Sequence, residues 1–558
     1  MSLSNRAPHS RDCELKRSWS RLARQISSHV VLFACIFAAS SALSRQHEGH
    51  GPQETVPRDI LTRPVTIRQG IGAAHQAVTA LSPEAQAFYD QGLAYLNSFV
   101  WIEAARSFNQ ALRLDPGLAM AHLGLSDAYI GLQDAASARD EFEKAQLLAE
   151  KVTDSERARI EIRAKQIDYL VDAGNLQKYF AYRQAITDAL KASPDDPWLW
   201  ILRGFADEGS PVAHGQGGGV DTIAFYETAL AYSPDNFAAH HYLAHTYENL
   251  GLAKEALEQS QAYERLAPAI PHAHHMVGHD LRRLGRTEDA IQEFLKAEQL
   301  ENAYYRAEQI PARYDWHHAH NLNLLAMCYQ ALGQMKAAEA AYREAFALPA
   351  FVDLAEYNRK SLPEFLLDED RPQEAFTSSQ ELIASRWPLA RFAGHAIAGQ
   401  ALLSMGRAAD AQNELSLAEQ ESEHVSASVI ARLPDAAVLR SEILLSEKQF
   451  DQGNALMAQI EDKIEAEPGP DAWSETLFQL DSISKMARKL GDWDLAESSA
   501  RRLIQHDPSY AGGYYALGLV ADHRGDSADA REKFATAEKL WAKADPELQR
   551  SRFQKTTD

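Results

Sequence analysis

Small and aromatic side chains recur along this chain at intervals of three and four residues, which is the spacing of one face of an α-helix. Ala104, Phe108 and Ala111 form one such set, and residues 530–537 repeat it with the same three residue types. Alanines allow two helices to approach closely, and the phenylalanine fills the space between them. No long run of alternating β-branched residues indicates a sheet. The pattern predicts an all-α protein built from paired helices.

A glycine that precedes an alanine by five residues recurs in these pairs, and it marks the turn between the two helices. Gly251 and Gly285 are 34 residues apart, and so are Gly491 and Gly525. The glycines are Gly251, Gly285, Gly333, Gly406, Gly491 and Gly525, and the alanines are Ala256, Ala290, Ala338, Ala411, Ala496 and Ala530.

A helix-turn-helix unit of 34 residues resembles the tetratricopeptide repeat, and residues 514–518 (YYALG) are similar to the core of its first helix. The resemblance implies a right-handed superhelical solenoid of helix-turn-helix repeats over residues 82–538, with roughly 11–12 helical pairs. In a solenoid each unit packs only on its neighbours, so a long chain needs no single large core. Degenerate pairs are predicted at 119–233, 353–390 and 426–466, and inserted loops at 209–219 and 304–316.

The ends of the chain differ from the repeats. Basic residues precede a short apolar run at 29–39, which predicts that residues 1–44 are a signal peptide or an N-terminal anchor. The protein is therefore expected to be exported, to the periplasm or the outside, with membrane contact only through this segment if it is uncleaved. Residues 45–81 are predicted to be a flexible linker, and residues 539–558 a C-terminal capping helix and tail.

Ten of the 21 histidines lie between His240 and His320. One i,i+4 pair stands ten and six residues before Gly251, and a second pair has the same offsets before Gly285. The tetratricopeptide resemblance implies that such first-helix positions face the concave groove, where the imidazoles would meet. Two further histidines lie thirteen residues before Gly285 and Gly333, and an asparagine lies ten before Gly333. The candidate ligand-binding residues are His241, His245, His272, His275, His279, His320 and Asn323.

An i,i+4 histidine pair presents two imidazoles on one helix face, which suits zinc, copper, nickel or iron. The candidate metal ligands are therefore His241, His245, His275 and His279, and Glu248 and Asp280 are nearby carboxylates in the sequence. Two alternatives stay open: a polar groove wall that binds a peptide or small ligand, and histidines packed for structure. Residues 272–280 and 317–321 also resemble a group of exported bacterial tetratricopeptide proteins in which histidines recur centrally, and this resemblance implies a shared site without naming its ligand.

The net charge is −22, and the first 44 residues contribute +4, so the remainder carries −26. Such a surface repels phosphate backbones and disfavours nucleic-acid binding. No catalytic constellation is predicted, because Cys328 lies in an apolar run typical of a packed thiol. The sequence favours an exported scaffold that binds a peptide, protein partner or small ligand in its groove. The alternative is a transition-metal-binding protein or metalloenzyme that uses the histidine cluster.

Overall fold

The computed structural model describes residues 55–208 and 215–553. Residues 1–44, predicted to be the leader, lie outside this part of the chain, as does the start of the predicted linker. Every regular element within the described ranges is helical. None of the helices in these ranges combines the length and the apolar character that a bilayer crossing needs.

The helices follow one another in antiparallel pairs, as the spacing of small residues predicted. Their N-termini carry expected start signals, such as the Ser82 side chain that accepts a hydrogen bond from the backbone N–H of Ala85. The helices are α3 (Arg58–Leu61), α4 (Pro83–Leu96), α5 (Trp101–Leu114), α6 (Ala119–Gly131), α7 (Ala135–Leu148), η1 (Ala149–Lys151), α8 (Asp154–Val171), α9 (Leu176–Ala192), α10 (Pro197–Asp207), α11 (Val220–Tyr232), α12 (Phe237–Asn249), α13 (Ala253–Leu266), α14 (Pro271–Arg283), α15 (Thr287–Glu308), η2 (Ala312–Tyr314), α16 (Trp316–Ala331), α17 (Met335–Ala347), α18 (Asp353–Asn358), α19 (Ser361–Asp368), α20 (Pro372–Ile383), α21 (Pro388–Ser404), α22 (Ala408–Ser422), α23 (Ala427–Ile430), α24 (Asp435–Ser446), α25 (Phe450–Ala466), α26 (Pro470–Leu490), α27 (Trp493–His506), α28 (Ala511–His523), α29 (Ser527–Leu540) and α30 (Pro546–Phe553).

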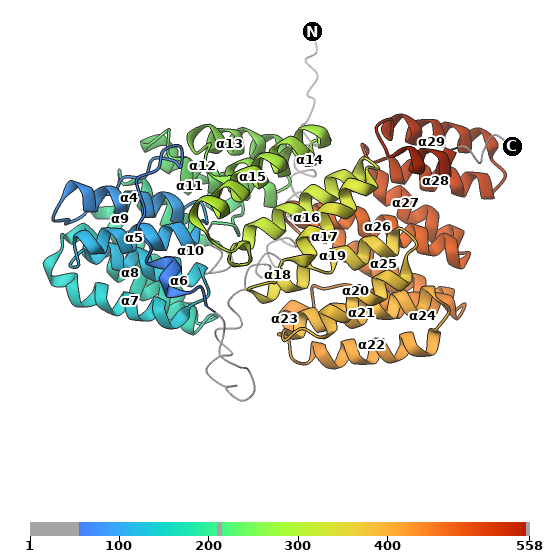
Figure 1. Ribbon diagram of the computed structural model, residues 1–558, viewed down its shortest axis with the longest axis horizontal. Helices are drawn as coiled ribbons and strands as arrows, with labels where there is room; N and C mark the ends of the chain where they lie inside the picture. Colours follow the sequence, from blue (N-terminus) through green and yellow to red (C-terminus); the bar gives the residue numbers. More distant parts are fainter. Residues whose placement is uncertain (1–54, 209–214, 554–558) are drawn as a thin grey trace, which may run out of the picture.

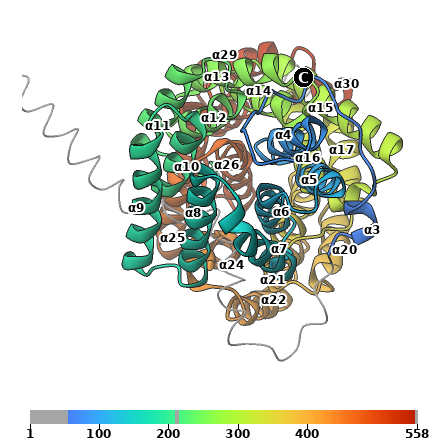
Figure 2. The same ribbon diagram turned by 90° about the vertical axis from the view of Figure 1, so that its left-hand side faces the viewer.

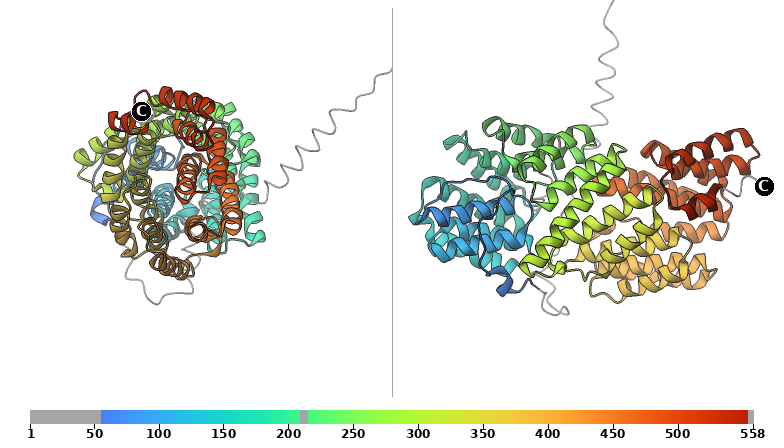
Figure 3. Two further views of the ribbon diagram at one scale, coloured as in Figure 1. Left: turned by 90° about the vertical axis from the view of Figure 1, so that its right-hand side faces the viewer. Right: turned by 45° about the horizontal axis from the view of Figure 1, so that its top comes forward.

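The pairs stack into a superhelix whose axis runs along the length of the molecule (Figure 1). Seen from the N-terminal end, the chain winds clockwise as it recedes from the viewer, so the superhelix is right-handed (Figure 2). The view from the opposite end shows the last pairs completing the same ring (Figure 3). The predicted all-α solenoid is confirmed.

The six glycines of the repeat pattern all adopt the left-handed conformation, with φ between 73° and 82°. A residue with a Cβ is strained there, which explains why glycine ends the first helix of these pairs. The six alanines five residues later are buried between the paired helices. The predicted role of both positions is confirmed.

Successive turns of the superhelix contact each other, which the repeat pattern did not predict. Helices α14 and α16 of one turn lie against α26 of the next. Arg282 forms a buried ion pair with Asp507, with 2.8 Å between Nη1 and Oδ2. Farther along, the indole N–H of Trp541 donates to the Ala331 carbonyl, and the Trp541 side chain packs beside Gly333. The last described residues are therefore seated on the central repeats, and within them the predicted capping segment is divided between the end of α29 and the short helix α30.

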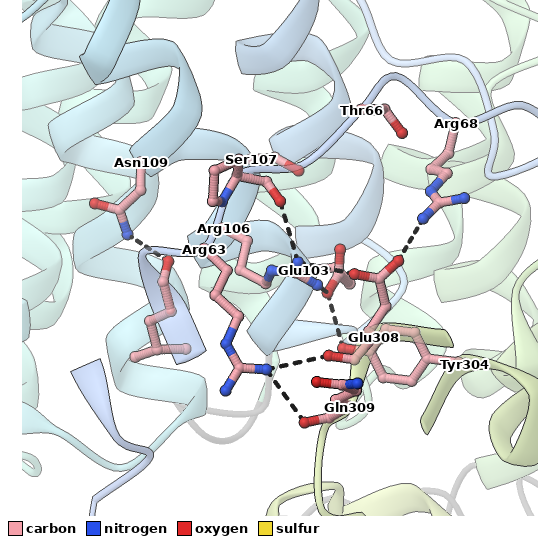
Figure 4. Close-up of polar contacts among 12 residues, drawn as sticks. Arg63, Thr66, Arg68, Glu103, Arg106, Ser107, Asn109, Tyr304, Glu308 and Gln309 are labelled. Atoms are coloured by element: carbon pink, nitrogen blue, oxygen red, sulfur yellow. Dashed lines mark hydrogen bonds and ion pairs between the residues drawn. The ribbon is translucent and has the colours of Figure 1, made fainter. Parts of the chain in front are cut away.

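Residues 55–81 differ from the flexible linker that was predicted for this range. Ile60, Leu61 and Ile71 are buried in the main apolar core. Polar contacts also fix the segment, because Arg63 donates to the Glu308 carbonyl and Arg68 pairs with the Glu308 carboxylate (Figure 4). Several apolar residues of this segment are therefore buried in the core, and two of its arginines contact Glu308 at the end of α15. Composition alone does not reveal these long-range contacts.

The predicted insertion at 304–316 is largely helical instead of a loop. Helix α15 continues to Glu308, so Tyr304 lies on a helix and donates a hydrogen bond to Glu103 of α5, at 2.8 Å between Oη and Oε1. In the described part of the other insertion, Gly215 approaches Tyr242 so closely that a Cβ would lie 2.0 Å from its ring. Glycine is required there both by this close packing and by its left-handed backbone, with φ at 95°.

Candidate metal centre

Seven histidines from the first helices of three consecutive pairs lie side by side in the centre of the molecule. They form three overlapping groups, and within each group three ligand atoms lie within 4.8 Å of one another. The groups share His272 and His275 with their neighbours. The first group is His241, His245 and His272, the middle group is His272, His275 and His317, and the third group is His275, His279 and His320.

Backbone and side-chain acceptors fix the ring orientations in the first group. Nδ1 of His241 lies 2.8 Å from the Asn97 carbonyl oxygen, which can only accept, so this nitrogen carries the proton. Nδ1 of His245 lies 3.0 Å from a carboxylate oxygen of Glu248 and donates in the same way. Both rings therefore turn their Nε2 atoms toward each other. Metal-binding histidines are oriented by such partners.

The resulting Nε2 atoms meet at short distances. Nε2 of His241 lies 3.1 Å from Nε2 of His245 and 3.0 Å from Nε2 of His272. Two nitrogens that share a tetrahedral zinc ion lie about 3.3 Å apart, given Zn–N bonds of about 2.0–2.1 Å. The two measured spacings are close to this value, so the three nitrogens are placed as ligands of one cation would be.

The third group combines the second histidine pair with a carboxylate from the next superhelical turn. Nδ1 of His275 donates to Oδ1 of Asn321 at 3.0 Å, and the Asn321 amide is held by its own bond to the Phe294 carbonyl. This turns Nε2 of His275 toward His279 and His320. Asp471, at the start of α26, lies opposite, with 3.6 Å from Oδ1 to Nε2 of His279 and 3.7 Å from Oδ2 to Nε2 of His320.

The middle group leaves buried nitrogens without hydrogen bonds. His317 is anchored through Nδ1 by Glu301, which also accepts from His318 at 2.7 Å. Nδ1 of His272, Nε2 of His275 and Nε2 of His317 are buried and find no hydrogen-bond partner in the described part of the chain. An unsatisfied buried polar atom is destabilising by about 1–3 kcal/mol. Three of them around one point indicate a site for a ligand.

The pKa values follow the burial and the anchoring carboxylates. Burial lowers the pKa of His241, His272 and His275 well below the ordinary value, and burial lowers that of His320 to about 4. These imidazoles are therefore neutral at pH 7, the form that binds metal. Burial opposes ionisation of Glu248 too, but the hydrogen bond from His245 and the nearby His279 imidazole, 3.4 Å away, lower its pKa to about 2.

The cluster is enclosed instead of lining an open groove. Phe99, from the loop between α4 and α5, packs with its ring centroid 4.7 Å from that of His241 and 5.3 Å from that of His272. The side chain of Asp471 is 44% exposed and that of His320 is 18% exposed. Solvent therefore reaches the third group beside Asp471, while Phe99 packs on the first group, whose most exposed side chain is His245 at 11%.

The remaining central histidines have structural contacts. His240 bonds to Gln259 and His274 to Glu293, in each case nineteen residues later on the second helix of the pair. His395 and Glu414 repeat this contact outside the cluster. These histidines lie eleven residues before the turn glycine, and a histidine at this repeat position joins the two helices of its pair. The offset of eleven residues therefore distinguishes them in the sequence from the histidines of the cluster.

Two polar residues near the cluster in the sequence do not hydrogen-bond to it. The polar contact from α16 to His275 comes from Asn321, whereas the candidate ligand-binding residue Asn323, two residues farther along the helix, has no hydrogen bond to these histidines among the described residues. Asp280 turns away and accepts from the Ser260 hydroxyl at 2.6 Å. Glu248 is the sequence-adjacent carboxylate that does reach the cluster.

Cys328 is buried as expected, and burial raises the pKa of its thiol to about 12.

Comparisons with known proteins bear on the fold. Tetratricopeptide repeat models match residues 101–151 and 485–546, residues 225–258, and residues 319–350. No curated protein matches the chain. A solved tetratricopeptide repeat protein from Parabacteroides merdae is 14% identical, covers 49% of this chain and 96% of its own, and has a TM-score of 0.33.

Human IFIT1, solved as a dimer with PPP-AAAA, is 13% identical, covers 83% of this chain and 91% of its own, and has a TM-score of 0.36. These structural similarities are too low to carry any inference about ligands. The repeat models, the 34-residue glycine period and the observed helix pairs agree with one another. The chain therefore contains tetratricopeptide repeats at several positions along its length.

Proposed function

We propose that this protein is an exported tetratricopeptide scaffold that binds a transition-metal ion through Nε2 of His241, His245 and His272. The observation that carries the proposal is the pair of Nε2 atoms, 3.1 Å apart, in rings whose Nδ1 atoms already contact Asn97 and Glu248. Neutral imidazoles favour zinc, copper, nickel or iron over calcium or magnesium.

The test is the metal content and metal-dependent stability of the full chain, purified without a histidine tag and stripped with a chelator. Added Zn²⁺ is expected to bind and to raise the free energy of unfolding by about 2.7 kcal/mol when its free concentration is 100 times the Kd. The double variant His241→Ala/His245→Ala is expected to lose binding at this group and at least half of the thermal gain. Elemental analysis and thermal denaturation measure the two effects.

Substitution of a histidine outside the candidate metal groups supplies the matched control. The variant His240→Ala removes a structural contact from the same helix α12 and is expected to keep full metal binding. A wild-type chain with less than about one tenth of an ion per molecule, and no thermal gain with Zn²⁺, Cu²⁺ or Fe²⁺, would overturn the proposal.

Binding of a basic peptide or protein partner is a second candidate function, favoured by a cavity in the C-terminal half. The cavity has a volume of about 400 Å³ and is lined by α16, α19, α21, α24 and α26. Five carboxylates and three lysines reach it, together with apolar side chains such as Phe365 and Phe478. The acidic excess suits a lysine or arginine side chain with an apolar stem. The carboxylates are those of Glu364, Asp368, Asp435, Glu442 and Glu475.

Glu442 in this cavity makes stability depend on pH. Burial raises the pKa of its carboxyl to about 7, although Gln400 donates to it and Lys489 is near. The folded protein therefore binds this proton more tightly than the unfolded chain, whose glutamates titrate near 4.3. The stabilising contribution is complete below pH 4.3 and is lost as the pH rises through 7.

Glu442→Gln is expected to reduce the loss of stability between pH 5 and pH 8. Urea denaturation of the two proteins at both pH values measures it. The exposed Glu423→Gln serves as the control and is expected to leave the wild-type pH dependence unchanged. A Glu442→Gln profile parallel to wild type would show that this carboxyl ionises normally in the folded state.

A further inference from the structure

The third histidine group has the features of a second metal site, distinct from the group proposed above. Nε2 of His275, both ring nitrogens of His279 and Oδ1 of Asp471 are buried atoms without a hydrogen-bond partner in the described ranges. The distances from Asp471 to His279 and His320, 3.6 and 3.7 Å, are too long for hydrogen bonds. Ligands about 2.1 Å from a common ion are separated by such distances.

We infer that a second transition-metal ion binds between His275, His279, His320 and Asp471, and that it cross-links two successive turns of the superhelix. The inference rests on the proposed function, since it assigns a second ion to the same histidine cluster. Three imidazoles and one carboxylate form a ligand set typical of zinc and other first-row metals.

The position of Asp471 gives this site its mechanical role. The histidines lie on α14 and α16, whereas Asp471 is the second residue of α26, about 150 residues farther along the sequence than His320. Trp473, on the first turn of the same helix, lies under the Arg282 guanidinium at 5.0 Å and accepts a hydrogen bond from His506. The start of α26 is therefore already docked on α14, with the carboxylate directed at the imidazoles.

Glu248 connects the second site to the first. Its Oε2 accepts from His245 of the first group at 3.0 Å, and its Oε1 lies 3.4 Å from Nδ1 of His279. One carboxylate thus orients a ligand of each site. The two sites differ in their access to solvent. The second site is open beside Asp471, whereas Phe99 packs on the first. The second ion is therefore expected to exchange faster than the first.

Zinc titration of the stripped full chain, with Asp471→Asn as the variant, tests the inference. The wild type is expected to bind two ions, and Asp471→Asn to weaken one of them by at least about tenfold while it leaves the other unchanged. Hydrogen exchange of residues 470–480 is expected to slow on zinc addition in the wild type but not in the variant. The exposed Asp522→Asn is the matched control and is expected to behave as wild type.

A second variant separates this inference from the proposed function. His241→Ala/His245→Ala is expected to retain one zinc ion and the zinc-dependent protection of residues 470–480. A wild type that binds one ion, loses it in that double variant and keeps it in Asp471→Asn would overturn the second site and leave the first standing. A wild type that binds no zinc would overturn both. Far-ultraviolet circular dichroism confirms that each variant is folded.

Discussion

Asp507→Ala is expected to lower the free energy of unfolding by about 3–5 kcal/mol, because it leaves a buried guanidinium without its partner. Arg282 and Asp507 are each only 4% exposed, and their ion pair joins α14 to the loop before α28. The Arg282 charge cannot reach water without separating the two turns. Equilibrium urea denaturation measures the loss, and hydrogen exchange is expected to increase most in α27–α29.

The double variant Arg282→Met/Asp507→Asn, which carries neither charge, provides the control for this pair. Replacing both charges removes the unpaired ion, so the double variant is expected to be more stable than Asp507→Ala. A loss below about 1 kcal/mol in Asp507→Ala would mean that Arg282 reaches water in the folded chain and that the turns are loosely docked.

Phe108→Ala is expected to lower the free energy of unfolding by a similar amount, about 3–5 kcal/mol. The Phe108 ring is fully buried between α4 and α6. Two glycines make room for it: a Cβ at Gly92 would lie 2.5 Å from the ring and a Cβ at Gly124 would lie 2.4 Å from it. Alanine at position 108 leaves a cavity between α4 and α6. The backbones of these helices cannot move together enough to fill it, so the cavity is expected to remain. Urea denaturation with the wild type as reference measures the change.

Phe534 supplies a control at the same repeat position. It packs on Gly518 in the last pair, but its side chain is partly exposed. Phe534→Ala is therefore expected to have less than half the effect of Phe108→Ala. Equal losses in the two variants would indicate that repeat position, and not burial, sets the energetic contribution of this phenylalanine.

The features that the sequence predicted correctly are those set within one or two repeats. Gly285 and Ala290 fix a turn and a close helix contact inside one pair, so a 34-residue period specifies them. The same period places His241 and His275 at equivalent positions of adjacent repeats, and the structure brings their two i,i+4 pairs together. Metal binding itself stays a prediction.

The features that the sequence did not predict depend on contacts between turns. Asn97, Phe99 and Asp471 meet the histidines only because the superhelix brings residues more than 100 positions apart into contact. The pitch of the superhelix is the sum of many small rotations between successive repeats, and no local sequence pattern specifies that sum. His317 was missed for a different reason: its role depends on Glu301, which sits on the unusually long helix α15.

Turn-to-turn contact also has a consequence for how the chain acquires its structure during synthesis. Each helical pair closes contacts of short sequence separation and can form as soon as it leaves the ribosome. Arg282 must wait for Asp507, which is 225 residues later, and Ala331 for Trp541, which is 210 residues later. Until those segments arrive, the polar inner face of α14 and α16 lies open on one side. We therefore expect the central histidines of the nascent protein to be accessible to chaperones or to metal donors. This access is expected to end when the later segments have been made and have docked.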